Sequence, residues 1–83
     1  MIEITPHARK RMEERGITIE QVEETVQNPE GTIEVKHGRK ASYRRYGSKF
    51  VVVIYEEEGE NVLVITALKV DERRLRRYGF GGV

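Results

Sequence analysis

The chain has 83 residues, of which 37% are hydrophobic and 35% are charged, and its formal net charge is +1. This length predicts a single domain over residues 1–83 with one modest core. The sequence contains no cysteine, which excludes disulfide frameworks, thiol catalysis and cysteine-based zinc sites and favours a reducing, cytoplasmic setting.

No apolar run approaches the roughly 18 residues of a membrane-spanning helix, and the N-terminus lacks the charged-then-apolar pattern of a signal peptide. We therefore expect no membrane partner. Glu and Arg predominate among the charged residues, a composition that favours a thermophilic source.

Two helices are predicted near the N-terminus, and the first begins with recognisable capping residues. Thr5 suits the N-cap, and Pro6 suits the first helical position because its missing N–H would be unpaired there in any case. Gly16 suits the left-handed residue that follows a helix. These residues predict a helix over about 5–15.

The second helix is predicted over about 18–28. Thr18 and Gln21 have the spacing of a capping box, and Asn28-Pro29 ends the helix because the residue before a proline avoids helical geometry. The exposed side of this helix is rich in glutamate, which repels phosphate. Recognition of a DNA groove by a helix–turn–helix pair is therefore disfavoured.

From residue 32 onward the hydrophobic period changes from 3.6 to 2, which indicates strands. Residues 1–4 alternate as well and fit either a short edge strand or an arm. Thr66 is expected on the same face of its strand as Val62, Val64 and Leu68, and residues 79–83 are expected to fray. The predicted strands and C-terminal turn cover about 32–36, 39–46, 49–56, 62–70 and 71–78. The predicted fold is α+β, with two N-terminal helices packed on a twisted four-stranded antiparallel sheet.

The charges are segregated along the chain. Residues 32–55 carry a net charge of +5, whereas residues 56–70 carry −3. The basic segment forms a hairpin in which Tyr43 and Tyr46 alternate with cations, a combination that can hold phosphates and stack bases. Its other charged members are Lys36, His37, Arg39, Lys40, Arg44 and Arg45. An edge hairpin charged to discourage aggregation explains the same pattern equally well.

No metal-ligand spacing and no phosphate-binding glycine loop is present, so neither a metal nor a cofactor is expected. The remaining His, Arg, Lys, Tyr and Thr residues suit metal-independent RNA cleavage, which needs a base, an acid and cations. His7 is the natural proton carrier because its unperturbed pKa is near neutral. Arg11 and Arg15 continue its line along the first helix. The structural alternatives are a surface histidine and arginines paired with Glu14 or with the sheet.

The segment His-Ala-Arg-Lys-Arg-Met-Glu-Glu-Arg-Gly-Ile at residues 7–17, the following helix that ends at Pro29, and Val-Ile-Thr at residues 64–66 resemble the domain-of-unknown-function family 4258. That family is similar in layout to RelE/ParE-type toxins and to the wider barnase–colicin-like ribonuclease fold. The arginine- and tyrosine-bearing tail at residues 76–78 is similar to the C-terminal basic and tyrosine residues of such toxins.

The resemblance implies a concave sheet face that cuts RNA. The catalytic residues implied are His7, Arg11, Arg44 and Thr66. The RNA-binding residues expected beside them are Arg15, Lys36, His37, Arg39, Tyr43, Arg45 and Tyr46.

Two functions follow as hypotheses. The first is a toxin-like, metal-independent endoribonuclease, or a relative that only binds RNA. The second is a non-enzymatic interaction module whose basic hairpin docks an antitoxin-like protein or a second copy of the chain.

Overall fold

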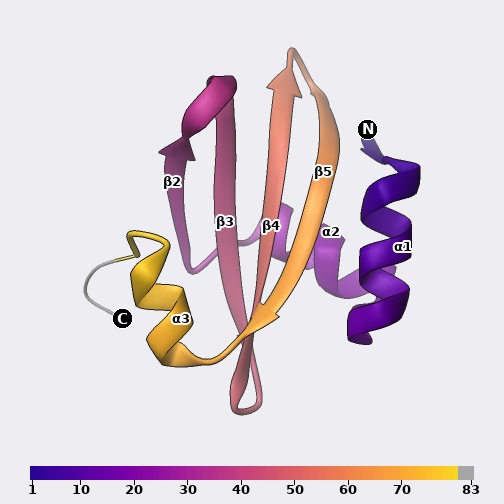
Figure 1. The fold of residues 1–83 in the computed structure, drawn as a ribbon. Coiled ribbons are helices and arrows are strands. Elements are labelled where there is room, and N and C mark those ends of the chain that lie inside the picture. The colour runs from indigo at the N-terminus through magenta and orange to yellow at the C-terminus, as the bar shows by residue number, and fades with distance from the viewer. Residues whose placement is uncertain (81–83) are drawn as a thin grey trace.

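The structure is a computed structural model that describes residues 1–80. Figure 1 shows a twisted sheet that α1 and α2 cover on one side. In chain order the elements are β1 (Ile2–Ile4), α1 (Pro6–Arg15), α2 (Ile19–Gln27), β2 (Gly31–Val35), the 3-10 turn η1 (Lys36–Gly38), β3 (Arg39–Tyr46), β4 (Lys49–Glu58), β5 (Asn61–Val70) and α3 (Glu72–Arg77).

The sheet has five strands in the order β1-β5-β4-β3-β2, and it is mixed rather than antiparallel throughout. β1 pairs with β5 in parallel, with Ile2 opposite Val62. The expected sheet of four antiparallel strands is therefore corrected to five strands with one parallel pair. The physical reason is that β1 supplies hydrogen-bond partners to the edge of β5, which would otherwise be open.

The two N-terminal helices begin and end at the residues whose chemistry marks them. The Thr5 side chain accepts a hydrogen bond from the backbone of Ala8, and Gly16 ends α1 with φ at +66°. The Thr18 side chain and that of Gln21 form a complete capping box at the start of α2. These bonds satisfy backbone groups that a helix end leaves unpaired.

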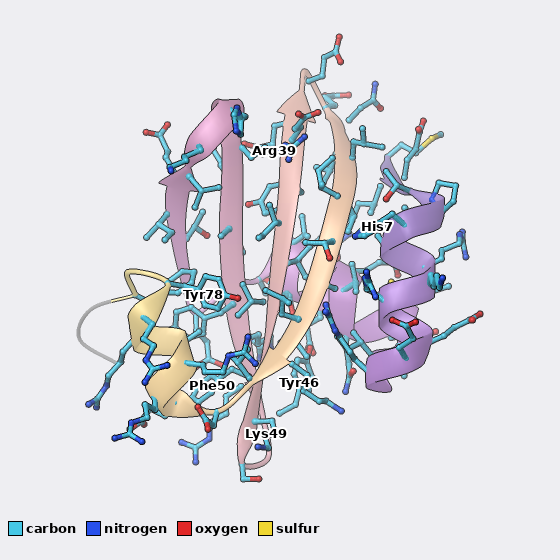
Figure 2. All side chains as sticks on the ribbon, viewed as in Figure 1. His7, Arg39, Tyr46, Lys49, Phe50 and Tyr78 are labelled. Carbon is cyan, nitrogen blue, oxygen red and sulfur yellow. The ribbon has the colours of Figure 1, made fainter. Side chains whose placement is uncertain are left out.

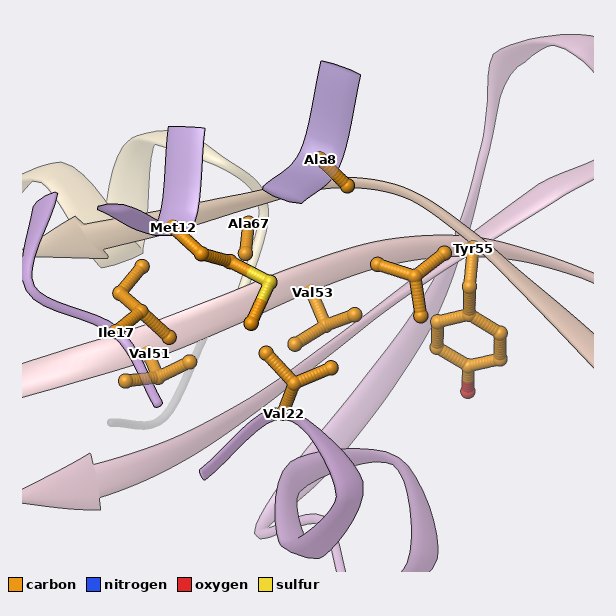
Figure 3. Packing of buried hydrophobic residues seen from close by; sticks show 9 residues of the cluster. Ala8, Met12, Ile17, Val22, Val51, Val53, Tyr55 and Ala67 are labelled. Carbon is orange, nitrogen blue, oxygen red and sulfur yellow. The ribbon is translucent and has the colours of Figure 1, made fainter. Parts of the chain in front are cut away.

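Each face of the sheet has its own apolar cluster. On the face that we call the helix face, α1 lies over β5, and α2 lies over β3 and β4. Figure 3 shows Met12 of α1 and Val22 of α2 packed against Val51 and Val53 of β4. On the opposite face, which we call the α3 face, Leu75 of α3 packs among side chains of the sheet. The buried residues of this second cluster are Ala41, Phe50, Val52, Val70, Leu75 and Phe80.

A β-bulge changes the direction of the side chains along β5. The register places Thr66 opposite Ile54 but Val64 opposite Tyr55, so one extra residue lies between them on β5. Paired residues of neighbouring strands point to the same face, and Ile54 packs against the α3-face cluster. Thr66 therefore points to the α3 face, away from Val64. The expectation that these two residues share a face is wrong, because an extra residue shifts the alternation by one.

The C-terminal segment packs on the sheet through residue 80. Asp71 caps α3 by accepting a hydrogen bond from the backbone of Arg74. Phe80 is only 3% exposed, and its ring lies edge-on to Tyr43 with the ring centres 4.7 Å apart. The expected fraying is thus wrong for residue 80, because this aromatic contact holds it. Residues 81–83 of that expectation lie outside the described residues.

Candidate functional site

The four residues expected to share a catalytic site lie on different parts of the fold. His7 and Arg11 are one turn apart on α1. Arg44 is on β3 and contacts α2, and β3 is separated from β5, the strand beneath α1, by β4. Thr66 points to the opposite face of the sheet. Figure 2 shows His7 on the side of α1 that borders β5. The structure therefore brings together His7 and Arg11 but neither of the other two residues.

The three predicted site arginines on the helix face bind acceptors of the protein itself. The Nη1 atom of Arg11 lies 2.8 Å from Oε1 of Glu14. This hydrogen bond from Arg11 lowers the pKa of the Glu14 carboxyl. Arg15 donates from Nη1 to the carbonyl oxygen of Ala67 at 2.7 Å, so it ties α1 to β5. Arg44 donates from Nη1 to the carbonyl oxygen of Asn28 at 2.7 Å. These contacts are the structural alternative to phosphate binding.

The basic hairpin is neutralised at the end of the sheet where η1 lies. Arg39 pairs with Glu56 at 3.2 Å and Lys40 pairs with Glu57 at 2.5 Å, and this carboxylate raises the pKa of Lys40. A shallow depression of about 370 Å³ at this end has four glutamates among its eight lining residues. Its lining residues are Glu3, Gly38, Glu56, Glu57, Glu58, Asn61, Val62 and Leu63. Lys36 and His37 are exposed beside this acidic end, which disfavours phosphate.

The two tyrosines of the hairpin are occupied by contacts within the protein. The ring of Tyr43 lies edge-on to Phe50 and Phe80. The hydroxyl of Tyr46 donates to Oε1 of Glu24 at 2.5 Å. Neither ring is positioned to stack on a base without first giving up these contacts.

The Tyr46 hydroxyl also gives the fold a testable dependence on pH. Its pKa lies above the ordinary value of 10.0, chiefly because of burial and then because it donates to Glu24. A phenol with a raised folded-state pKa adds stability below the unfolded pKa, and this contribution is lost as the pH rises through the folded pKa. We expect Tyr46→Phe to lower the free energy of unfolding by about 1 kcal/mol at neutral pH.

The difference between the wild type and Tyr46→Phe should shrink as the pH rises above about 10, where the phenolate meets the Glu24 carboxylate. Urea unfolding at several pH values measures this difference directly. A difference that stays constant into the alkaline range would contradict the role given to the hydroxyl.

At the other end of the sheet, cations gather without carboxylate partners. In the antiparallel register Phe50 lies opposite Val70, so the first residue of β4 lies beside the residues just after β5. Lys49 accordingly helps to lower the pKa of Asp71, after the backbone hydrogen bond from Arg74, which is the main cause. The guanidinium of Arg45 lies 5.7 Å from the ring centre of Phe50, and its Nε donates to the carbonyl oxygen of Gly47 at 2.9 Å. Figure 2 shows Lys49 and Phe50 at the end of the sheet beside α3.

We call this region the α3 basic surface and define it by the residues Arg45, Lys49, Arg73, Arg74 and Arg77. All five are exposed. In the part of the chain that the structure describes, none of them forms an ion pair. The carboxylates on α3 and its cap are those of Asp71 and Glu72, and the latter is paired with Arg76.

A groove of about 250 Å³ lies on this surface, lined by Arg74, Arg77 and Tyr78. The sequence did not identify Lys49, Arg73, Arg74, Arg77 or Tyr78 as site residues, although the resemblance drew attention to the tail at residues 76–78. Their proximity follows from the pairing of β4 with β5, because two consecutive antiparallel strands place the start of the first beside the end of the second.

Residues 1–80 contain no group of three or more His, Asp or Glu side chains placed to hold a metal ion. Over the same residues, no helix has the length and apolar character needed to cross a membrane.

A family model described as "Domain of unknown function (DUF4258)" matches residues 4–76, from within β1 to within α3. No curated protein and no solved structure matches the chain.

Proposed function

We propose that this chain, which belongs to the DUF4258 family, binds RNA by holding its phosphate backbone on the α3 basic surface. The observation that carries the proposal is the set of five exposed cations without ion pairs at one end of the sheet. Four of the five are arginines, whose planar guanidinium matches a phosphate with two parallel hydrogen bonds.

We also propose that the fold is related in layout to RelE/ParE-type toxins. The supporting observation is that two N-terminal helices cover one face of the sheet while the basic C-terminal helix lies on the other. The parallel pairing of β1 with β5 is a departure from the expected antiparallel sheet.

The RNA hypothesis has two forms, an endoribonuclease and a relative that only binds RNA, and binding without cleavage has the better support. General acid–base catalysis requires the proton carrier to lie within about 3 Å of the atom that it serves. His7 lies on α1 on the helix face, whereas Thr66 and α3, which carries three of the five cations, lie on the other side of the sheet. We therefore infer that His7 takes no part in chemistry at the bound RNA.

The direct experiment is to incubate labelled single-stranded RNA with an excess of protein in EDTA. We expect the RNA to be bound and to stay intact. If all five cations contact phosphates, the slope of log affinity against log salt is about −3.5, because each contact contributes about 0.7 for single strands. Binding should then weaken by about 100-fold between 50 and 200 mM salt.

Fluorescence anisotropy gives the affinity and a denaturing gel shows whether the RNA is cut. The absence of binding at low salt would overturn the proposal. Cleavage that persists in EDTA and disappears in His7→Ala would instead restore the endoribonuclease hypothesis.

The interaction module is the second candidate, and one observation favours it. Beyond α3, apolar side chains of the α3 face are only partly buried, among them Ile33, Val35, Ile54 and Leu68. A second copy of the chain or an antitoxin-like protein could cover them. Concentration-dependent dimerisation that persists in high salt would favour this candidate, because apolar contacts are not screened.

A further inference from the structure

We infer that the groove beside Tyr78 receives one unpaired base, so that the α3 basic surface selects single-stranded over double-stranded RNA. This inference rests on the proposed RNA binding and adds the class of RNA. Two observations carry it. Arg74, Arg77 and Tyr78 line one groove, and Tyr78 is partly exposed there.

Tyr78 differs from the other aromatic side chains of residues 1–80. Phe50 and Phe80 are buried, and Tyr43 contacts both of their rings. Tyr46 and Tyr55 are held by hydrogen bonds of their hydroxyls. Tyr78 is partly exposed, packs against the α3-face cluster with part of its surface, and shares an open groove with two arginines.

The position of Tyr78 is fixed by the end of α3. Its backbone has helical dihedral angles, with φ at −79°, and its N–H bonds to the carbonyl oxygens of Leu75 and Arg76. Leu75 is fully buried and anchors this turn on the sheet. The ring is therefore supported from beneath, which keeps the entropy cost of stacking a base on it small.

The arginines give the groove its chemical preference. Arg74 and Arg77 are three residues apart, so their side chains lie on the same side of α3, and both line the groove with Tyr78. Guanidinium groups beside an aromatic ring can hold the phosphates that flank a stacked base. The volume of about 250 Å³ lies just below the roughly 300 Å³ at which sites for drug-sized ligands begin, which suits one base.

A duplex cannot use this groove in the same way. Its bases are paired and stacked inside the helix, and freeing one costs unstacking energy. A duplex can still contact the cations through its phosphates. Base stacking on an aromatic side chain is therefore the interaction that distinguishes the two forms of RNA.

The experiment measures the affinity of the full chain for a single-stranded oligonucleotide and for its duplex at one salt concentration. We expect the single strand to bind roughly 5- to 150-fold more tightly, the factor that stacking of one base supplies. Tyr78→Leu should remove this preference by weakening only the single strand, and Tyr78→Phe should keep it because the ring remains. The salt slope should be the same in all three proteins, because Tyr78 contacts no phosphate.

Equal affinity of the wild type for both forms would overturn the inference and leave the proposed RNA binding in place. Binding of neither form would overturn both. If Tyr78→Leu weakens the duplex as much as the single strand, the residue only supports α3, and the inference is wrong. Circular dichroism of each variant shows whether it is folded, and the wild-type comparison needs no variant.

Discussion

Arg74→Glu combined with Arg77→Glu is expected to weaken RNA binding by at least tenfold at about 100 mM salt, because two phosphate contacts are replaced by two repulsions. Both side chains are exposed, so the fold should persist. The salt slope should become shallower by about 1.4, since each lost contact removes about 0.7 for a single strand. Anisotropy titrations of one RNA at several salt concentrations give both quantities.

The matched control is Arg9→Glu combined with Lys10→Glu. It changes the net charge by the same amount, and both residues are adjacent, exposed cations on α1, on the helix face of the sheet. We expect the RNA affinity of this variant to stay within about twofold of the wild type, because screening at this salt confines each charge to a range of about 10 Å. Equal losses in both variants would mean that overall charge, and no particular surface, attracts the RNA.

The helices could be predicted because their signals are local. The Thr5 side chain bonds to the backbone of Ala8, and that of Thr18 bonds to the backbone of Gln21, so each cap lies within three residues of its partner. The change of period at residue 32 is likewise a property of neighbouring residues. Such patterns specify an element wherever it packs.

The errors in the sheet arose from pairing between distant residues. Ile2 is opposite Val62, and nothing in three alternating residues indicates whether they pair or remain an arm. The bulge between Val64 and Thr66 is a feature of the register between β4 and β5. A run of apolar residues on a central strand looks the same with or without such a bulge, because both faces are covered.

The sequence could not indicate which cations are available to a ligand, because residue type does not show which charges are already paired. Arg15 binds a carbonyl oxygen 52 residues away, and Arg39 of β3 binds Glu56 of the neighbouring strand β4. The residues of the hairpin have a positive net charge, but in the folded protein ion pairs with glutamates of β4 neutralise its η1 end. Within residues 1–80, Lys49 and Arg74 lie near the Asp71 carboxylate but form no ion pair with it.

Leu75→Ala is expected to lower the free energy of unfolding by about 2–5 kcal/mol, the range for a buried leucine truncated to alanine. Leu75 is fully buried in the α3-face cluster and is the buried residue of α3 itself. A small domain has only about 5–15 kcal/mol of stability in total, so this single change removes a large part of it. Urea unfolding followed by circular dichroism measures the loss.

The same substitution should also weaken RNA binding under conditions in which the sheet stays folded, because α3 and its arginines lose their anchor. The control is Val22→Ala, which is expected to cost about 2 kcal/mol and lies in the cluster of the helix face. The folded fraction of Val22→Ala should bind RNA as the wild type does. Hydrogen exchange of the α3 amides separates local detachment of α3 from global unfolding. Faster exchange confined to residues 72–77 in Leu75→Ala would show that Leu75 holds the binding surface in place. Unchanged RNA affinity of folded Leu75→Ala would instead place the RNA elsewhere.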